Sequence, residues 1–391
     1  MNGVELLSNI EAVIGEEEFS EKLLLDRNLK VKFGVDPTRP DLTFGHLVVF
    51  NKLKQFQDAG HEAILLIGDY TARIGDPSGR SSLRPELTEK EVEENAKTYL
   101  EQAFRILDPE KTTVRRNSEW FSGMSFADAL SLTRKMTVAR MLERDDFEKR
   151  FQNNQPISMV EFMYPLIQGY DSVVLESDVE LGGSDQLFNM LVGRNLQKDR
   201  EVVPQTVLTL PLLVGLDGKR KMSKSFGNYI AFNDSAKDIF GKIMSIPDEA
   251  MWDYFKLLLL RSEESLGELK KRHPMDAKKE LAEELTALFY GESVGDKERK
   301  SFSKVFSKRD VPSELPRFSI SKMGLDSDNL LEILSATQLF RSKGEIRRLI
   351  QQGAIKLDGK KIEDSSLVLE PTDREGIVIK AGKKLFFQIL K

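Results

Sequence analysis

The chain has 391 residues, a formal net charge of −5 and no cysteine. Its length predicts about two or three domains of ordinary size. The lack of cysteine excludes disulfides, thiolate metal sites and cysteine nucleophiles, and it fits a reducing, cytoplasmic location. With only three histidines, a structural zinc site is not expected, so we predict no protein-bound metal. The sequence contains no secretory signal and no apolar run long enough to span a membrane, so we expect no membrane partner.

The charge is unevenly distributed along the chain. From Gln338 to the last residue there are 12 Lys or Arg residues against 7 Asp or Glu residues, a net of +5. The rest of the chain is therefore acidic. This asymmetry predicts an acidic body followed by a basic tail domain.

The first half of the chain alternates strand-like apolar runs with amphipathic helical patterns. Such alternation predicts an α/β fold with a doubly wound parallel sheet. A possible capping box, Thr88 with Glu91, opens one of the helices. The predicted strands cover residues 29–35, 61–69, 112–117 and 206–215, and the predicted helices cover 45–60, 87–107, 159–175 and 182–198.

The strand signal stops after residue 231, which suggests three domains. Residues 1–231 would form the sheet domain, with a helical insertion near 126–159. Residues 232–320 carry helical periodicity and predict an α-helical domain, although the proline-containing stretch 308–327 has the composition of a linker. Residues 321–391 show two helical patterns followed by short strands, and they predict a small α+β domain.

A basic loop, "DGKRKMSKSFGN" at 217–228, follows the last predicted strand of the sheet. Four Lys or Arg residues fall between Lys219 and Lys224. Loops at the carboxyl ends of parallel strands line the ligand crevice of such folds, and lysines placed there suit a polyphosphate. The alternative interpretation is a solvated surface loop.

The stretch "GVDPTRPDLTFGHL" at 34–47 leads from the first strand into the first helix. A helix N-terminus offers free N–H groups and a positive dipole end, so it favours anions. Gly45 would let a ligand approach the backbone, and His46 could donate a hydrogen bond to a phosphate. The alternative is that Thr43 caps the helix and His46 packs against it.

The tail carries a row of cations that would suit the phosphates of RNA. They are spaced to cluster on one side of a helix and beside a strand turn, with few aromatic residues between them. The alternative is a charged, solvated helix face. The predicted RNA-binding residues are Arg341, Lys343, Arg347, Arg348, Lys356 and Lys360.

These stretches together resemble a known enzyme family. "KMSKS" at Lys221–Ser225 and "TFGH" at Thr43–His46 resemble the two signatures of class I aminoacyl-tRNA synthetases. Over nearly the whole chain, further segments resemble the bacterial tyrosyl-tRNA synthetases, and the tail resembles their RNA-binding domain of the ribosomal S-four type. The segments are "GVDPTRPDLTFGH", "IGDPSGR", "EFMYPLIQGYDSVVLE", "ELGGSDQ", "KMSKSFGNYI" and "LFRSKGEIRRLIQQGAIKLDGKKI".

The resemblance implies a Rossmann-like catalytic domain, an anticodon-recognition domain at 232–320 and an RNA-binding domain at 321–391. It implies activation of tyrosine by ATP, with Mg²⁺ held mainly by the phosphates, and transfer to tRNA(Tyr). It also implies a homodimer joined through the segment 126–159. Two alternatives are a tryptophanyl-tRNA synthetase and a non-catalytic RNA-binding relative of these enzymes.

The resemblance also implies roles for individual residues at the ATP end of the site. Asp185 would accept hydrogen bonds from the ribose, and Gly183 would let the nucleotide approach the backbone. The implied catalytic residues, which surround the departing pyrophosphate, are Thr38, Thr43, His46, Arg80, Arg84, Lys221 and Lys224. The implied ATP-binding residues are Gly45, His46, Gly183, Asp185, Lys221, Met222, Ser223, Lys224 and Ser225.

The amino-acid pocket is indicated by polar residues on an otherwise apolar helix. Tyr164, Gln168 and Asp171 are three or four positions apart, so they share one helix face and need polar partners. By resemblance, Asp171 accepts from the substrate phenol. The residues implied for the substrate ammonium are Asp76, Tyr164 and Gln168, with Gln186 as an additional contact.

Two positions depart from the family pattern. Lys32 stands where many bacterial relatives have a tyrosine that also touches the substrate phenol. Thr43 stands where the motif usually has histidine. Threonine keeps a hydroxyl donor for phosphate but carries no positive charge, so the lysine loop and Arg84 would compensate.

Overall fold

The computed structural model describes residues 3–75, 87–307, 315–325, 328–358, 360–362, 364–365, 367–369, 376–382 and 385–390. The chain forms two compact units, Met1–Arg299 and Lys300–Lys391. Within the described residues, every helix is too short or too polar to traverse a lipid bilayer.

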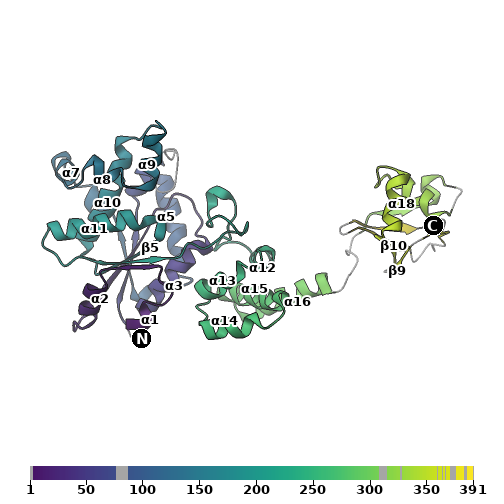
Figure 1. Ribbon diagram of the computed structural model, residues 1–391, viewed down its shortest axis with the longest axis horizontal. Coiled ribbons are helices and arrows are strands. Elements are labelled where there is room, and N and C mark those ends of the chain that lie inside the picture. The colour runs from purple at the N-terminus through teal and green to yellow at the C-terminus, as the bar shows by residue number, and fades with distance from the viewer. Residues whose placement is uncertain are drawn as a thin grey trace. The chain divides into compact units, whose positions relative to one another are not determined.

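The first unit is built on a six-stranded sheet in the order β1-β6-β5-β2-β3-β4 (Figure 1). β1 is antiparallel to β6, and the other four neighbouring pairs are parallel. The predicted parallel α/β fold is therefore confirmed. The strands are β1 (Ala12–Ile14), β2 (Lys30–Val35), β3 (Glu62–Ile67), β4 (Thr112–Arg116), β5 (Val179–Gly183) and β6 (Thr206–Leu210).

The strand order reverses direction between β2 and β5. From β2 the chain builds outward through β3 to β4, and it then returns to place β5 on the other side of β2, followed by β6. In doubly wound sheets, such a reversal opens a crevice at the carboxyl ends of the two strands. We therefore expect the ligand site beyond Val35 of β2 and Gly183 of β5.

Helices cover both faces of this sheet. Alternate side chains of β2 point to opposite faces. Phe33 packs edge-on against Phe50 of α3 (Phe44–Asp58), whereas Lys32 reaches α10 (Met159–Leu175) on the other face. Figure 1 shows α10 and α11 (Leu187–Asp199) on one side of the sheet and α3 on the other.

The remaining helices of the sheet region are short, apart from α5. The segment 126–159, predicted as a helical insertion, contains α7 to α9, and apolar residues of these helices form a core with α10 and α11. Buried Arg150 forms an ion pair with Glu161 at the start of α10. The helices are α1 (Gly3–Leu6), α2 (Glu16–Leu23), α4 (Thr71–Ile74), α5 (Glu89–Ala103), α6 (Ser118–Phe121), α7 (Phe126–Thr133), α8 (Val138–Met141) and α9 (Asp145–Gln152).

Several element boundaries differ from the sequence prediction. β5 was missed, because its five residues include Glu180 and two glycines, which are poor strand formers. The helix predicted from residue 182 begins only at Leu187, and the strand predicted to reach residue 215 ends before Pro211. The short edge strand β1 was also missed.

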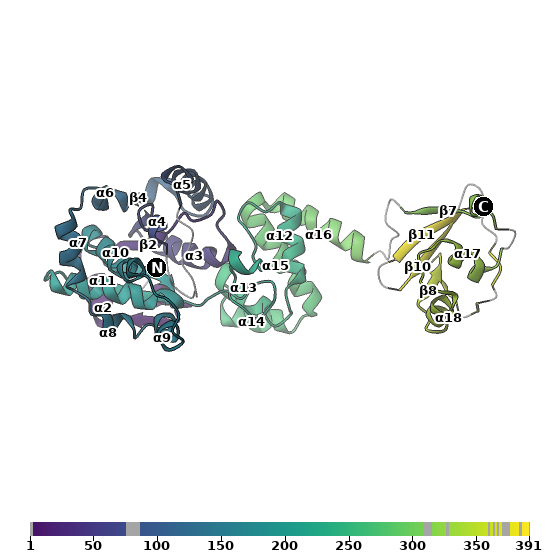
Figure 2. The ribbon, with the colours of Figure 1, turned by 90° about the horizontal axis from the view of Figure 1, so that it is seen from above.

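A helical layer follows the sheet region, as the sequence predicted. Phe289 of α15 stacks on Phe44 of α3, and Arg105 donates to the carbonyls of Phe232 and Phe289, so α15 packs on the sheet region within the first unit. Figure 2 shows the helices grouped together. They are α12 (Ala236–Ser245), α13 (Met251–Leu258), α14 (Glu263–Lys270), α15 (Pro274–Tyr290) and α16 (Glu292–Ser307). The three-domain division remains a prediction.

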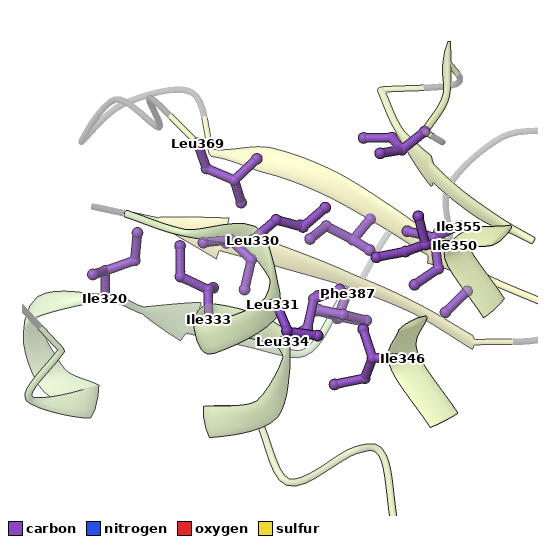
Figure 3. Close-up of a cluster of buried hydrophobic side chains, with 14 residues drawn as sticks. Ile320, Leu330, Leu331, Ile333, Leu334, Ile346, Ile350, Ile355, Leu369 and Phe387 are labelled. Atoms are coloured by element: carbon purple, nitrogen blue, oxygen red, sulfur yellow. The ribbon is translucent and has the colours of Figure 1, made fainter. Parts of the chain in front are cut away.

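The second unit is a small α+β structure with a sheet in the order β7-β11-β10-β8-β9. Its helices and strands enclose a core that includes Leu330, Ile346 and Phe387 (Figure 3). Part of the stretch predicted as a linker forms β7. The elements are β7 (Arg317–Ser319), α17 (Leu330–Ala336), α18 (Lys343–Gln351), β8 (Ile355–Leu357), β9 (Lys360–Lys361), β10 (Ile377–Ala381) and β11 (Leu385–Leu390).

Phe387 is expected to carry much of the stability of the second unit, because its ring is fully buried in the core of Figure 3. We expect Phe387→Ala to lower the free energy of unfolding of this unit by about 3–5 kcal/mol. Phe386, on the opposite face of β11, is only partly buried, so Phe386→Ala should cost much less. Hydrogen exchange would measure both units separately, and equal losses for the two variants would contradict this prediction.

Candidate active site

A cavity of about 300 Å³ opens where the strand order reverses. It collects predicted residues from the segment between β2 and α3, from α3, from α10, from the end of β5 with the turn that follows it, and from the 217–228 loop. Of the predicted site residues, Asp76, Arg80 and Arg84 lie outside the described residues. Those lining the cavity are Thr38, Thr43, Gly45, His46, Tyr164, Gln168, Asp171, Gly183, Asp185, Gln186, Lys221, Met222, Ser223, Lys224 and Ser225.

Two contacts that α10 makes, one with β2 and one with Asp36 directly after it, mark the depth of the cavity. At the mouth, the Tyr164 hydroxyl donates to Asp36 Oδ2 at 2.7 Å. Deeper, Lys32 Nζ donates to Ser172 Oγ at 2.6 Å. Helix and strand therefore run antiparallel, and the two contacts are about 12–13 Å apart by the rise of either element. This depth suits an elongated ligand.

Gly34 keeps the space between these two contacts open. It lies between Lys32 and Asp36 on the same face of β2. A Cβ at this position would have only one neighbour within 4 Å, the Leu66 Cδ2 at 3.9 Å. Any larger side chain would project toward the cavity, which Gly34 itself lines.

Asp171 is a buried carboxyl group at the deep end of the cavity. Trp120 Nε1 donates to its Oδ1 at 3.0 Å, and Asn117 Nδ2 approaches its Oδ2 at 3.5 Å. Burial raises the pKa of Asp171 to about 8, although the nearby Lys32 charge opposes this rise. Trp120 and Asn117 were missed by the sequence analysis, because they lie in α6 and its cap, far from the recognised motifs.

A buried ion pair lies beside Asp171. Lys32 and Glu180 are directly opposite each other on β2 and β5, and Lys32 Nζ is 2.9 Å from Glu180 Oε1. Gln205 and Ser172 donate to Glu180 Oε2, and Gln168 donates to its Oε1 at 3.4 Å. Glu180 was not predicted, because a lone glutamate in an unrecognised strand carries no motif.

At the mouth, Asp36 is fixed by hydroxyl groups from two sides. Besides Tyr164, Thr71 donates to its Oδ1 at 2.7 Å. Gly68 is required here, because a Cβ would lie 2.1 Å from that same oxygen. Asp36 lies within the recognised motif, yet the sequence analysis gave it no role. The structure adds it to the site.

Thr43 and His46 begin α3 with a reciprocal capping box. The Thr43 N–H donates to His46 Nδ1 at 3.1 Å, and the Thr43 hydroxyl lies 2.9 Å from the same nitrogen. Burial lowers the pKa of His46 to about 3, and the Lys224 charge acts in the same direction. His46 is therefore neutral, and because Nδ1 accepts, its proton is on Nε2. Thr43 caps the helix, as the alternative interpretation had it.

The 217–228 loop is ordered by its first residue. Asp217 accepts from the N–H groups of Lys219 and Arg220 at 3.1 and 3.0 Å, and these bonds lower its pKa to about 2. Lys221 Nζ donates to Asp185 Oδ2 at 2.6 Å, and Lys224 Nζ donates to the Tyr99 hydroxyl at 3.0 Å. Both lysines therefore line the cavity, whereas Lys219 and Arg220 of the same loop are exposed.

Gly183 ends β5 at a crowded position. A Cβ would lie 2.7 Å from Asp185 Oδ1 and 2.9 Å from Leu212 Cδ2. The turn η2 (Ser184–Gln186) then places Asp185 and Gln186 on the cavity wall before α11 begins. No group of three or more His, Cys, Asp or Glu side chains that could hold a metal occurs among the described residues.

The predicted RNA-binding cations lie in the second unit. Buried Ile346 and Ile350 face the core from α18, so the arginines of this helix face outward. Lys343 forms an ion pair with Glu332 of α17 at 2.7 Å. The exposed predicted cations are Arg341, Lys343, Arg347, Arg348 and Lys360, whereas Lys356 is partly buried.

Two family models match this chain. The model described as tRNA synthetases class I (W and Y) matches residues 25–307. The model described as the tyrosine–tRNA ligase SYY-like C-terminal domain matches residues 309–389. The first covers tryptophan and tyrosine enzymes alike, so the second is the more discriminating match.

Curated relatives and solved structures agree with these models. Tyrosine–tRNA ligase of Thermotoga maritima is 50% identical over 390 residues, 98% of this chain and 96% of the relative. Tyrosine–tRNA ligase of Chlorobaculum tepidum is 48% identical over 393 residues, 100% and 95% of the two chains. Tyrosyl-tRNA synthetase of Archaeoglobus fulgidus, solved with L-tyrosine, has a TM-score of 0.63 at 25% identity and covers 75% of this chain and 97% of its own. The predicted Rossmann-like fold and the predicted family are confirmed, and the chain belongs to the tyrosine–tRNA ligase family of class I tRNA synthetases.

Proposed function

We propose that the cavity between β2, α10 and the 217–228 loop is where this tyrosine–tRNA ligase activates tyrosine with ATP. One observation carries the proposal. The cavity combines a buried carboxyl group, Asp171, at its closed end with two lysines, Lys221 and Lys224, at its mouth. A phenol-bearing amino acid and a polyphosphate need this combination. The tryptophan enzyme is disfavoured, because the indole N–H offers one donor and no acceptor to so polar a closed end.

The substrate phenol would bind Asp171, with the amino-acid backbone toward the mouth. Trp120 and Asn117 orient Asp171, so a carboxyl oxygen of Asp171 can accept a hydrogen bond from the phenol without moving. The ammonium would lie near Tyr164 and Gln168, assisted by Asp76, with Gln186 as an additional contact. Gln168 is held by Asn189, which donates to its Oε1 at 2.9 Å.

In the first step, a carboxylate oxygen of tyrosine attacks the α-phosphorus of ATP. The new O–P bond forms as the bond to pyrophosphate breaks, so pyrophosphate departs with the electron pair. No covalent protein nucleophile is needed, and catalysis depends on positioning and on neutralising charge. Lys221 and Lys224 would neutralise the pyrophosphate, together with Arg80 and Arg84. In the second step, a terminal ribose hydroxyl of tRNA(Tyr) attacks the carbonyl carbon of the adenylate and AMP leaves.

His46 would act as a neutral hydrogen-bond donor toward the phosphates. Its Nδ1 is occupied by Thr43, so Nε2–H is the group left to donate. Thr38 and the backbone at Gly45 would add further contacts, with Met222, Ser223 and Ser225 lining the nucleotide site. Thr43 acts through His46 as a positioning residue. This modifies the earlier expectation that its hydroxyl itself donates to phosphate.

Asp185 would receive the ribose, and Mg²⁺ would arrive with ATP. In the structure Asp185 accepts a hydrogen bond from the Lys221 ammonium. The ribose hydroxyls would replace this bond, and the Lys221 ammonium would then be available to the phosphates. Mg²⁺ binds phosphates readily and keeps several waters, so the triphosphate itself can hold it. The substrates ATP and tRNA suit a cytoplasmic location.

The cations of the second unit would contact tRNA(Tyr). Arg347 and Arg348 are exposed on α18, and Lys360 is exposed on β9. Cations on a rigid helix can contact phosphates without reading bases, which suits recognition of folded RNA by its shape. The non-catalytic alternative would retain this surface but would not need the lysines of the cavity.

A homodimer would cover an apolar surface on α7, α9 and the start of α10. Phe126, Phe151 and Met159 are 79%, 63% and 76% exposed. Large apolar side chains that are this exposed within one segment of the chain suit a contact with another protein surface. The segment 126–159 is also the one that the resemblance implies for the subunit contact.

The proposed activity is tested by ATP–pyrophosphate exchange with the full chain. We expect exchange with tyrosine and little with tryptophan. Gly34→Ala should raise the KM for tyrosine by roughly tenfold to hundredfold, because the added methyl group enters the cavity. Stability should be unaffected, since the methyl group meets only Leu66 at 3.9 Å.

Gly241→Ala provides the matched control, because Gly241 lies in α12 with no atom within 4 Å of an added Cβ. It should leave the KM unchanged. Exchange driven by tryptophan alone would refute the tyrosine assignment, and an unchanged KM in Gly34→Ala would refute the position of the substrate.

Asp171 should make stability depend on pH. The native carboxyl group keeps its proton up to a pKa of about 8, whereas the unfolded one loses it near pH 4. Folding therefore takes up a proton between these values, and the free energy of unfolding falls as pH rises. Asp171→Asn should remove up to about 1.4 kcal/mol per pH unit of this dependence. Urea unfolding from pH 5 to 8 measures it, and parallel curves for parent and variant would contradict it.

Phe126 should be required for dimerisation. We expect sedimentation of the parent at micromolar concentration to show a dimer, and Phe126→Asp to shift it toward monomer by burying a charge in the contact. Leu24→Asp is the control, because Leu24 is 87% exposed on another part of the same unit. Dimer dissociation by both variants, or a monomeric parent, would exclude this surface.

A further inference from the structure

The deep end of the cavity contains a cation that the mechanism above leaves unused. Lys32 is only 1% exposed, and its Nζ bonds Ser172 Oγ at 2.6 Å and lies 2.9 Å from Glu180 Oε1. An ammonium group has three N–H donors. Ser172 uses one of them and the Glu180 carboxylate lies beside the ammonium, so a donor remains for a further partner.

The position of Lys32 places its ammonium at the wall of the cavity. Lys32 lies on the same face of β2 as Gly34 and lines the cavity. Ser172, its partner on α10, directly follows Asp171. Lys32 and Asp171 are close enough for the charge of Lys32 to act on the Asp171 carboxyl group. The ammonium and this carboxyl group therefore flank the closed end beyond Gly34.

Stability alone does not account for the Lys32–Glu180 pair. Removing two charges from water costs free energy, and a well-packed apolar pair often supports a fold equally well or better. Glu180 is nevertheless held by Gln205, Ser172 and Gln168 as well as by Lys32. These partners hold the Glu180 carboxylate in one position, and the carboxylate in turn holds the Lys32 ammonium.

We propose that Lys32 is a specificity-determining residue whose ammonium donates a hydrogen bond to the hydroxyl oxygen of the substrate tyrosine while Asp171 accepts the hydroxyl proton. A phenol is both a donor and an acceptor, and its buried oxygen needs a donor to satisfy it. An ionised Asp171 accepts but cannot donate, so it satisfies only the hydroxyl hydrogen, and the neighbouring Lys32 charge favours this ionised form. A hydrogen bond from a charged donor is stronger than one between neutral groups. The inference rests on the proposed function, because it requires the phenol at Asp171.

The first test measures kcat/KM in ATP–pyrophosphate exchange for tyrosine and phenylalanine. Lys32→Met keeps the chain length, and Lys32→Met with Glu180→Gln also removes the carboxylate that would otherwise be left unpaired. Both should lower the ratio of tyrosine to phenylalanine by roughly tenfold or more, through tyrosine alone. An unchanged ratio, or equal losses for both substrates, would overturn the proposal.

Lys52→Met is the matched control. Lys52 is also a buried lysine, but it donates to the carbonyls of Leu6 and Ser8 at 3.0 and 2.7 Å and does not line the cavity. This variant should lose stability while keeping the tyrosine-to-phenylalanine ratio. If the tyrosine-to-phenylalanine ratio fell equally in Lys52→Met, the effect of the Lys32 variants would reflect lost stability alone. That result would overturn the role of Lys32 in specificity.

A second test needs no variant and so does not depend on folding. Para-aminophenylalanine keeps an N–H for Asp171 but offers Lys32 a much poorer acceptor than a phenol oxygen. The parent should use it with a kcat/KM roughly tenfold or more below that of tyrosine. Equal use of the two would overturn the role of Lys32. A parent that shows no exchange with tyrosine would instead refute the proposed function.

Discussion

The packing of α10 against β2 is the interaction on which the rest of the site depends. Tyr164 with Asp36 and Ser172 with Lys32 join the two elements at either end, and Gly34 supplies no side chain between them. The result is a slot that opens at the carboxyl ends of the strands, rather than a filled core. One missing side chain on a central strand thus provides the space, and two polar contacts prevent the helix from collapsing into it.

The slot has different electrostatics at its two ends. The closed end contains three ionisable groups, Lys32, Asp171 and Glu180, taken out of water and surrounded by fixed hydrogen-bond partners. Fixed dipoles and charges in a site of low dielectric act strongly on a ligand without reorganising. The mouth instead presents lysines on a loop that Asp217 orders. The closed end therefore suits recognition of the substrate side chain, and the mouth suits neutralisation of phosphate charge.

The two departures from the family pattern acquire a physical meaning in this setting. Thr43 uses its N–H and hydroxyl on His46 Nδ1, so the histidine is presented with its other nitrogen as the donor. Lys32 is paired with Glu180 directly across the strands. In both cases the substituted residue forms a new contact within the protein, and in the case of Lys32 the contact pairs the added charge with a carboxylate.

The sequence by itself determined the parallel sheet, the family and about half of the residues of the cavity wall. Alternating patterns and contiguous motifs are local, so "TFGH", "KMSKS" and the polar face of α10 could be recognised without a structure. Only the tertiary structure decided which of these side chains meet. Lys32 and Ser172 are 140 positions apart, and Tyr164 and Asp36 are 128 apart. The roles of Asp36 and Glu180 depend on such long-range contacts, because a lone carboxylate is defined by the groups that fold around it.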